Sequence, residues 1–193
     1  MVEKEMSKDK EQQTRQEAKI EGLLTEKGIK VKAKQRVEEL KTKGYGINEN
    51  GELLLNFYEA LHLVDRGLLE VKDEKGEKIG FQELLQISEK ADENAWAKYM
   101  VYRDLRSRGY VVREGFGANI DFRVYERGEY GKDTAKYLVL TLQEGKPITL
   151  EELNQIVRQC QSLKKELIVA VMSRRGEIVY YSVSQLTLPS SSV

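Results

Sequence analysis

Three side chains in the second half of the sequence have the types that metal-free cleavage of RNA requires. Tyr125 ends an expected strand, Lys165 begins a later one, and Arg158 precedes Lys165 by two helical turns. A phenol and two cations can supply a base and the positive charge that stabilises a developing phosphorane. The spacing allows these three side chains to converge, although tyrosines and lysines at strand ends are also common for structural reasons.

The histidine that such chemistry usually employs is absent from this half of the chain. Histidine serves as a proton donor because its pKa lies near neutral pH, and the only histidine of the sequence is His62. It lies in an expected helix at 57–68, where we interpret it as a structural or surface residue. The single cysteine, Cys160, excludes an internal disulfide, and these two residues are too few for a zinc site.

A second, metal-dependent chemistry uses acidic residues. Asp121 lies in an expected strand and Glu144-x-Lys146 follows the next one, which resembles the D…ExK arrangement of metal-dependent nucleases. The carboxylates would hold Mg²⁺ and the lysine would steady the attacking water. However, Glu144 to Pro147 also has the composition of a turn that ends a strand, and short motifs of this kind arise often by chance.

The residues that could carry either chemistry depend on a sheet expected in the second half. A helix opens near Asp92 and stops at Gly109, and a capping box at Thr149 and Glu152 begins another. The turn at 173–176 makes the last two strands an antiparallel hairpin on a mixed sheet. Runs of β-branched and aromatic residues predict five strands, at 110–112, 120–125, 137–142, 167–172 and 178–183.

The first half is expected to form a smaller α/β domain of short elements. Asn56 is a candidate helix cap, and Gly67 marks the end of the helix that follows it. The expected elements are a helix within 31–40, turns at 43–46 and 48–51, a strand at 53–55, a helix at 57–68, a strand at 68–71, a turn at 73–76 and a helix at 81–87.

Composition divides the chain into four parts. We expect a charged tail or frayed helix over 1–20, an α/β domain over 21–92, a second domain over 93–188 and a loose tail over 189–193. Nine of the twelve arginines follow position 93, so the second domain is the better candidate for a nucleic-acid surface.

The overall composition is that of a folded protein without a membrane segment. The 193 residues are 40% hydrophobic and 33% charged, with a formal net charge of zero. No apolar run approaches the roughly 18–20 residues that span a bilayer. Because the N-terminus also lacks the apolar segment of a signal peptide, we expect a cytoplasmic protein with no membrane partner.

Longer stretches of the sequence are more specific than any of these patterns. They are residues 101–112, 115–116, 121–125, 136–139, 166–171 and 180–184 in the second half, and residues 43–46 and 58–71 in the first. Over these stretches, roughly residues 30–185, the chain is similar to the archaeal tRNA-splicing endonucleases.

This resemblance implies a fold and a reaction. The fold would be of the α+β class, with a small α/β N-terminal domain and a C-terminal endonuclease-like domain whose mixed sheet is related to restriction nucleases. The family cuts pre-tRNA at bulge-helix-bulge junctions with a Tyr, His, Lys triad, and leaves a 2′,3′-cyclic phosphate and a 5′-hydroxyl. No metal and no cofactor is expected.

The resemblance carries over to two residues of the triad but not to the third. Tyr125 matches the tyrosine, and Lys165 matches the lysine, with Lys164 as the alternative after a shift of one residue. Thr134 stands where the family has its histidine, and a threonine hydroxyl is not a general acid at neutral pH. Arg158 matches an arginine that clamps a bulged base by stacking, so it is the expected RNA-binding residue.

The loop between the last two strands also departs from the family. Self-assembling members carry an acidic loop that docks into a basic groove of the opposite dimer, whereas this loop contains Arg174 and Arg175. A different partner is therefore favoured. We place the subunit interface on these two arginines and on apolar and aromatic residues of the last strand, which are Ile178, Val179, Tyr180, Tyr181 and Val183.

These observations predict a structural, noncatalytic subunit of a heterotetrameric (αβ)₂ tRNA-splicing endonuclease. Its partners would be a catalytic paralogous subunit and pre-tRNA with a bulge-helix-bulge motif. Three alternatives stay open: a catalytic endonuclease in which Lys132, Lys136 or water replaces the histidine, an RNA-binding or assembly scaffold outside splicing, and a metal-dependent nuclease that uses Asp121.

Overall fold

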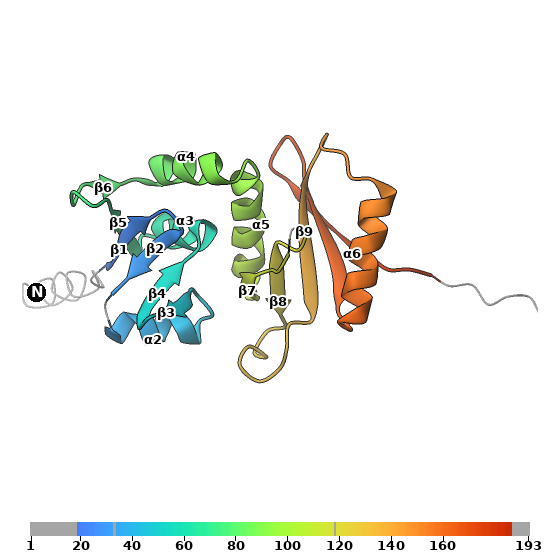
Figure 1. Ribbon diagram of the computed structural model, residues 1–193, viewed down its shortest axis with the longest axis horizontal. Helices are drawn as coiled ribbons and strands as arrows, with labels where there is room; N and C mark the ends of the chain where they lie inside the picture. Colours follow the sequence, from blue (N-terminus) through green and yellow to red (C-terminus); the bar gives the residue numbers. More distant parts are fainter. Residues whose placement is uncertain (1–18, 33, 118, 187–193) are drawn as a thin grey trace, which may run out of the picture. The chain divides into compact units, whose positions relative to one another are not determined.

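The computed structural model describes residues 19–32, 34–117 and 119–186 (Figure 1). The chain divides into two compact units, Met1–Ala91 and Asp92–Val193, and each is built on its own mixed sheet. The α+β class expected from the sequence is confirmed. The tail expected over 1–20 lies outside the described residues except for positions 19 and 20, and the tail expected over 189–193 lies wholly outside them.

The first unit contains a six-stranded sheet in the order β3-β4-β2-β1-β5-β6. Its first strand pairs with β2 as an antiparallel hairpin and with β5 in parallel. The remaining pairs in this sheet are antiparallel. The strands are β1 (Ile20–Thr25), β2 (Gly28–Val31), β3 (Ile47–Glu49), β4 (Glu52–Leu55), β5 (Leu69–Lys72) and β6 (Lys78–Ile79).

Three helices, α2 (Lys34–Thr42), α3 (Phe57–Asp65) and α4 (Phe81–Ala91), complete this unit. Helix α3 packs against β2, β5 and α4, because its apolar residues recur at helical spacing and Leu61 and Leu63 are buried. Asn56 is the N-cap residue of α3, as expected, and its N–H donates to the carboxylate of Glu59 (3.0 Å).

The first unit also holds strands that the sequence analysis missed. No element was expected over 21–30, yet β1 and β2 lie there, and Val31 ends β2 rather than beginning a helix. Strand β3 occupies part of the segment expected as a turn, because only Asn50 and Gly51, both at positive φ, form the turn between β3 and β4.

The second unit contains a five-stranded sheet in the order β11-β10-β9-β8-β7. Strands β9 and β10 are parallel, and the other pairs are antiparallel. The five expected strands and the antiparallel hairpin at the end of the chain are therefore confirmed. The strands are β7 (Val111–Glu114), β8 (Phe122–Tyr125), β9 (Tyr137–Gln143), β10 (Glu166–Met172) and β11 (Ile178–Val183).

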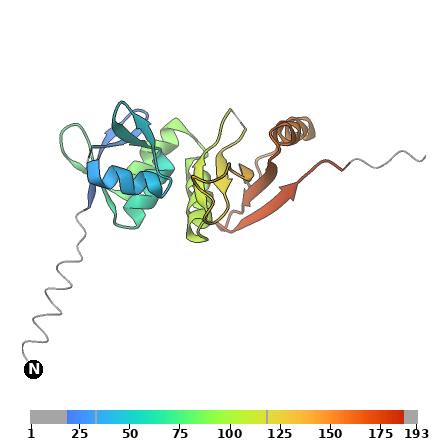
Figure 2. The ribbon, with the colours of Figure 1, turned by 90° about the horizontal axis from the view of Figure 1, so that it is seen from below.

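Helices α5 (Ala95–Ser107) and α6 (Leu150–Ser162) cover opposite faces of this sheet (Figures 1 and 2). The ring of Tyr102 on α5 contacts Phe122 of β8, whereas Ile156 and Cys160 of α6 belong to the core cluster on the other face. The alternation of side chains along each strand produces these two apolar faces. Among the described residues, no helix has both the length and the apolar composition that crossing a membrane requires.

The caps of these two helices fix where they begin. The capping box expected for α6 is confirmed, since the Glu152 N–H donates to the hydroxyl of Thr149 (3.1 Å) and the Thr149 N–H donates to the carboxylate of Glu152 (2.9 Å). Helix α5 is capped at Asn94 rather than at Asp92, because the Asp92 carboxylate accepts the Asn94 N–H (2.9 Å) and holds the turn before the helix.

Candidate functional site

At one end of the sheet of the second unit, β8 stops where its neighbours β9 and β10 begin. We call this row of strand ends the edge. Lys136, directly before β9, joins both neighbours: its N–H donates to the Val124 carbonyl (3.0 Å), and its carbonyl accepts from the N–H of Glu166 (3.1 Å). Tyr125 directly follows Val124, and Lys165 directly precedes Glu166. The sheet therefore brings Tyr125 and Lys165 to the same edge, on the strands on either side of β9.

Thr134 lies at this edge as well, in contact with Lys165. The Lys165 Nζ donates to the Thr134 Oγ1 at 2.6 Å. The Thr134 hydroxyl in turn donates to the Asp133 carboxylate at 3.4 Å, and the Thr134 N–H donates to the same oxygen at 2.6 Å. A hydroxyl thus connects an ammonium group to a carboxylate. We name Tyr125, Thr134 and Lys165 the β8–β10 edge.

The ring of Tyr125 is fixed by a neighbouring aromatic side chain. It meets Tyr130 edge to face, with 5.0 Å between the ring centroids and 87° between the planes. This geometry is favourable for an aromatic pair. Tyr130 belongs to the loop between β8 and β9, so the loop that carries Thr134 also orients Tyr125.

The turn between α6 and β10 decides which of two adjacent lysines reaches Thr134. Lys164 lies in this turn at positive φ (55°) and is exposed. The Lys165 N–H donates to the Cys160 carbonyl (2.9 Å), and its half-buried side chain extends to Thr134. The geometry therefore favours Lys165 over Lys164 as the partner of the edge.

The contacts of Lys136 do not favour a role as a proton donor. Its Nζ donates to Glu126 (2.7 Å) and lies 5.2 Å from the centroid of the Tyr137 ring. The hydrogen bond to Glu126, followed by that to Tyr137, raises the pKa of Lys136 well above its usual value. An ammonium group with a raised pKa releases its proton less readily at neutral pH. Lys132, the other candidate, lies in the exposed loop before β9.

Arg158 is presented to solvent rather than to the edge. It is exposed on α6, which ends at Ser162 with a cap at Leu163. Lys165 therefore follows the end of the helix, and the two-turn spacing from Arg158 does not place both residues on one continuous helix. The structure brings Tyr125, Thr134 and Lys165 to the edge, and it leaves Arg158 exposed on α6.

The residues of the metal-dependent alternative serve separate structural contacts. Asp121 accepts the N–H of Thr141 (2.6 Å) and pairs with Lys98 (2.9 Å). Glu144 accepts the N–H of Arg174 (2.9 Å). Within the described residues, no three His, Cys, Asp or Glu side chains gather in a way that would hold a metal ion.

The third member of that motif, Lys146, is also engaged elsewhere. Its Nζ contacts the carboxylate of Glu93 (3.0 Å) and the side-chain carbonyl of Asn94 (2.8 Å). Lys146 thus links the β9–α6 loop to the start of α5. The three residues of the D…ExK spacing therefore each have a structural contact within the fold.

The two adjacent tyrosines of β11 have different surroundings. Tyr180 is half-buried, and its hydroxyl donates to Asp104 of α5 (2.7 Å), which also accepts two bonds from Arg108 (2.7 and 3.2 Å). Burial, followed by the bond to Asp104, raises the pKa of Tyr180 well above its usual value. Tyr181 points to the other face and is 54% exposed, and Val179 is 49% exposed.

The remaining residues expected at the interface also differ from one another. Ile178 and Val183 are half-buried, and Val183 packs against the α6 core cluster. Arg174 and Arg175 are exposed in the tight turn between β10 and β11, which the Ser173 N–H closes onto the Glu177 carbonyl (2.8 Å). Strand β11 is one of the two outermost strands of the five-stranded sheet, so its exposed side chains lie at the border of that sheet.

The single histidine and the single cysteine of the sequence are both buried. His62 is 5% exposed on α3, and its ring lies 6.4 Å from that of Tyr45. Cys160 is in the core of the second unit, where burial raises the pKa of its thiol. Both contribute to packing.

Two features escaped the sequence analysis. Asp133, the acceptor beside Thr134, was overlooked although it directly precedes that residue. In the first unit, Arg36, Lys43 and Arg66 line a common pocket. The helical spacing of Arg36 and Lys43 about Glu39 offered a signal for two of these, whereas the position of Arg66 depends on how α3 packs.

Both units match models of one protein family. Residues 20–85 match the tRNA intron endonuclease, N-terminal domain, and residues 95–180 match the tRNA intron endonuclease, catalytic C-terminal domain. Together these matches cover most of the chain.

Individual relatives agree with the family matches. The chain is 36% identical over 169 residues to a tRNA-splicing endonuclease of Methanococcus vannielii, a match that covers 88% of this chain and 96% of the relative. It is 38% identical over 144 residues to one of Hyperthermus butylicus (75% and 79%) and 34% identical over 139 residues to one of Thermococcus kodakarensis (72% and 81%).

Proposed function

The chain belongs to the tRNA intron endonuclease family, and within that family we propose that it is a structural, noncatalytic subunit of a heterotetrameric tRNA-splicing endonuclease. A paralogous subunit with a complete Tyr, His, Lys triad would perform the cleavage. This chain would contribute to assembly and to binding of pre-tRNA with a bulge-helix-bulge motif.

The observation that carries the proposal is the hydroxyl of Thr134 at the β8–β10 edge. Under the resemblance, Thr134 stands where the family has its histidine, and its hydroxyl accepts a hydrogen bond from Lys165 and donates one to Asp133. Its proton is therefore directed at a carboxylate within the chain, and a hydroxyl does not release it near neutral pH. Loss of one proton-transfer group typically costs about 10²–10⁴-fold in rate.

A catalytic role with another proton donor is less well supported. Lys136 is paired with Glu126, and its raised pKa opposes proton release. Lys132 is exposed in the loop before β9 and is not part of the contacts of the β8–β10 edge described above. The separate contacts of Asp121, Glu144 and Lys146 likewise give no support to a metal-dependent nuclease.

Two surfaces support a role in a larger complex. Val179 and Tyr181 are exposed on an outermost strand, and an exposed apolar and aromatic strand is suited to burial against another subunit. The Arg158 guanidinium is open on α6, where stacking on a base or contact with a phosphate requires no catalytic histidine.

The proposal is tested by cleavage of a bulge-helix-bulge RNA in the presence of a chelator. The chain alone, its triad-complete paralogue alone and the mixture are compared, and the products are examined for a 2′,3′-cyclic phosphate. We expect cleavage by the mixture and none by this chain alone. A comparable rate with the lone chain would show that it is catalytic.

A further inference from the structure

The C-terminal end of α5 borders a hollow on the sheet of the second unit. The helix ends at Ser107, and Gly109, at positive φ (87°), turns the chain toward β7 (Figure 1). Beside this end of the helix, the surface is hollowed and encloses about 290 Å³. We name it the tyrosine hollow, and its lining is Leu105, Arg108, Tyr110, Val124, Tyr137, Val139, Ile168 and Tyr180.

The floor of the tyrosine hollow consists of aliphatic side chains from three neighbouring strands. Val139 of β9 is paired in register with Ile168 of β10, and Val124 of β8 is paired with Tyr137 of β9. Residues that lie opposite each other, or two apart on one strand, share a face of the sheet. Val124 and Val139 are each 1% exposed, and Ile168 is half-buried. The floor is therefore apolar, and it suits a flat ring better than a charged group.

Each of the three tyrosines that line the hollow has a cation over its ring. The distances from the guanidinium carbon or the ammonium nitrogen to the ring centroid lie within the range of cation–π contacts. The pairs are Arg108 over Tyr180 (5.8 Å), Arg127 over Tyr110 (5.4 Å) and Lys136 over Tyr137 (5.2 Å). The hollow thus combines an apolar floor with aromatic rings and a border of cations.

Carboxylates within the chain hold two of these three cation–ring pairs. The Tyr180 hydroxyl and the Arg108 guanidinium both donate to Asp104, at 2.7 Å for the hydroxyl and at 2.7 and 3.2 Å for the guanidinium. The hydroxyl of Tyr137 and the cation over its ring both donate to Glu126, at 3.3 and 2.7 Å. These two rings are therefore oriented before any ligand arrives, which lowers the entropic cost of binding.

Arg127, the cation of the third pair, differs from the other two. It is exposed, and among the described residues it has no ion-pair partner. Its side chain lies over Tyr110 and beside Gly109, where a Cβ would be 3.6 Å from the Arg127 Nε. The Tyr110 N–H donates to the Leu105 carbonyl (3.2 Å), so this ring is fixed to the end of α5. The N–H donors of Arg127 are arranged in a planar fork that suits phosphate oxygens.

We propose that the tyrosine hollow binds an unpaired nucleotide of RNA, with the base on the apolar floor and a phosphate at Arg127. Unpaired bases are bound by stacking on aromatic side chains and on guanidinium planes, and both surround this floor. The enclosed space is close to the lower limit of about 300 Å³ for small-ligand pockets, so it admits a single flat group. A cation at the border complements the charge that a nucleotide brings with its base.

The position of the hollow favours RNA as the source of the nucleotide, and this step rests on the proposed function. Val124 lines the hollow, and Tyr125, the next residue of the chain, belongs to the β8–β10 edge. Because side chains alternate along a strand, the hollow and Tyr125 lie at the same end of the sheet on opposite faces. RNA that passes this end can contact both. A free mononucleotide has the same chemistry, whereas an apolar side chain of the paralogue is a different occupant.

The first experiment titrates the lone chain with an RNA trinucleotide that carries 2-aminopurine at its centre, at constant ionic strength. Stacking quenches the fluorescence of this base, so we expect saturable quenching. Arg127→Ala, at an exposed position, should weaken binding by about tenfold. Arg175→Ala is the matched control, because it removes an exposed arginine of the same unit outside the hollow. Quenching that does not saturate, or an affinity that is unchanged in Arg127→Ala, overturns the site.

A second set of titrations separates the base from the phosphate. Tyr110→Ala should weaken binding by about tenfold, whereas Tyr110→Phe, which keeps the ring, should bind as the unmodified chain does. A trinucleotide with an abasic centre should compete about tenfold less well than the intact one. Equal competition by the two would mean that only the backbone is bound, and the proposed base site would be wrong.

The third experiment tests the source of the nucleotide in the complex of this chain with its paralogue. Arg127→Ala should weaken binding of a noncleavable bulge-helix-bulge RNA by about tenfold and leave binding of a fully paired duplex nearly unchanged, because only the first offers unpaired bases. Adenosine 5′-monophosphate is titrated into the lone chain in parallel. Unchanged binding of the bulged RNA, together with saturable binding of the mononucleotide, overturns RNA as the source.

Assembly provides a further readout. If Tyr110→Ala prevents the chain from co-eluting with its paralogue, the hollow receives a side chain of that subunit and the nucleotide proposal fails. The trinucleotide titrations use the lone chain and no cleavage assay. A failure of the proposed function therefore leaves the test of the hollow intact.

Discussion

The β8–β10 edge and the outer surface of α6 place cations in opposite situations. At the edge, the ammonium group of Lys165 is linked through Thr134 to the carboxylate of Asp133. On α6, Arg158 is exposed and has no ion-pair partner among the described residues. The difference suggests that a cation satisfied within the chain supports the fold, whereas an unsatisfied one is available to a ligand.

The largest effect is expected from restoring an imidazole at the edge. Thr134→His is combined with a paralogue whose own catalytic histidine is replaced, so that any cleavage comes from this chain. The rate should rise by about 10²–10⁴-fold over the unmodified chain in the same complex, because a general acid is regained. The cleavage rate of this complex should fall as the pH rises above the imidazole pKa of about 6.5, since the protonated ring is the donor.

The control for this gain is the same chain with Lys165→Ala added, which should lose most of it. Thr134→Ala should give no gain. If the Thr134→His chain binds the RNA and the complex still does not cut it, the lack of activity at the edge has a cause other than the missing imidazole, and the comparison between the edge and α6 does not explain it.

A second prediction concerns Asp104, a carboxylate whose partners all lie within the chain. Burial alone would raise its pKa, but the hydrogen bonds from Arg108 and Tyr180 outweigh burial and lower the pKa. Since the folded pKa is below the unfolded value of about 4, the carboxylate stabilises the fold above that pH, and the contribution is lost as the pH falls through the folded pKa. Asp104→Asn should therefore be less stable at pH 7.

Denaturant unfolding of both proteins between about pH 7 and pH 2 measures this difference. The difference in the free energy of unfolding between the unmodified chain and Asp104→Asn should decrease below about pH 4. A stability difference that stays constant over this pH range would mean that the charge of Asp104 does not stabilise its contacts with Arg108 and Tyr180.

The adjacent tyrosines of β11 provide a matched pair for the same principle. Tyr180→Phe removes the hydrogen bond to Asp104 and should lower the free energy of unfolding of the lone chain by about 1–2 kcal/mol. Tyr181→Phe, at an exposed position, should change it by less than about 0.5 kcal/mol. Equal effects in denaturant unfolding would contradict the assignment of Tyr180 to the fold and Tyr181 to the surface.

The smallest effect is expected from leaving Lys165 without a compensating carboxylate, as Arg158 is on α6. Asp133→Asn keeps an oxygen that can accept the Thr134 N–H but removes the charge that compensates Lys165. RNA binding by the complex should tighten by about two- to fivefold, as exposed ion pairs are worth less than about 1 kcal/mol. Glu129→Gln removes the same charge elsewhere in the loop and should have a smaller effect in the same binding assay.

The sequence predicts the sheet of the second unit well. Long runs of β-branched residues gave all five strands, and the Thr149 capping box gave the start of α6. The first unit was harder because its strands are short and mix apolar with polar residues, and β1 contains Gly22, which weakens the strand signal. Strand β3 was interpreted as a turn because its residues include Asn48 and Glu49.

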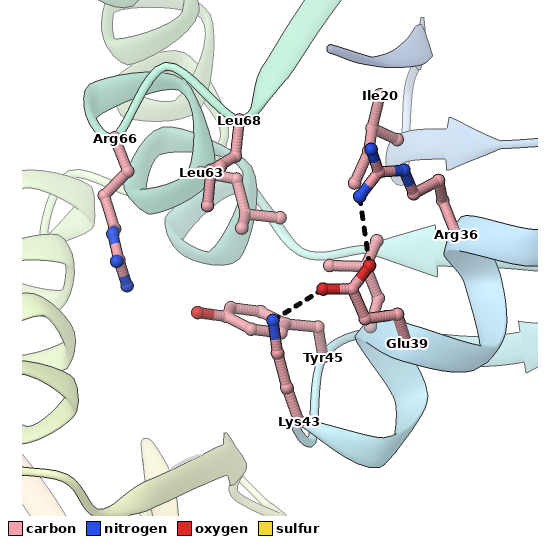
Figure 3. A pocket seen from close by; sticks show the side chains of 9 residues that line it. Ile20, Arg36, Glu39, Lys43, Tyr45, Leu63, Arg66 and Leu68 are labelled. Carbon is pink, nitrogen blue, oxygen red and sulfur yellow. Dashed lines mark hydrogen bonds and ion pairs between the residues drawn. The ribbon is translucent and has the colours of Figure 1, made fainter. Parts of the chain in front are cut away.

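For the candidate site, the sequence indicates which residues matter but not how their charges are balanced. The positions of Tyr125, Thr134 and Lys165 follow from the family resemblance. The hydrogen bonds of Thr134 to Asp133 and of Lys136 to Glu126 depend on side-chain rotamers, which a one-dimensional pattern does not encode. The pocket that Arg36, Lys43 and Arg66 line depends on the tertiary arrangement of the segments that carry them (Figure 3).

The pairing of β1 with both β2 and β5 has a consequence for the order of folding during synthesis. The β1–β2 hairpin is local and can form as soon as residue 31 is available, but the parallel partner of Ile20 is Leu69. Closing so long a segment carries an entropic cost before its contacts form. The first sheet therefore remains incomplete on the ribosome until β5 has emerged, and during that interval the outer edge of β1 is exposed to incorrect strand pairing.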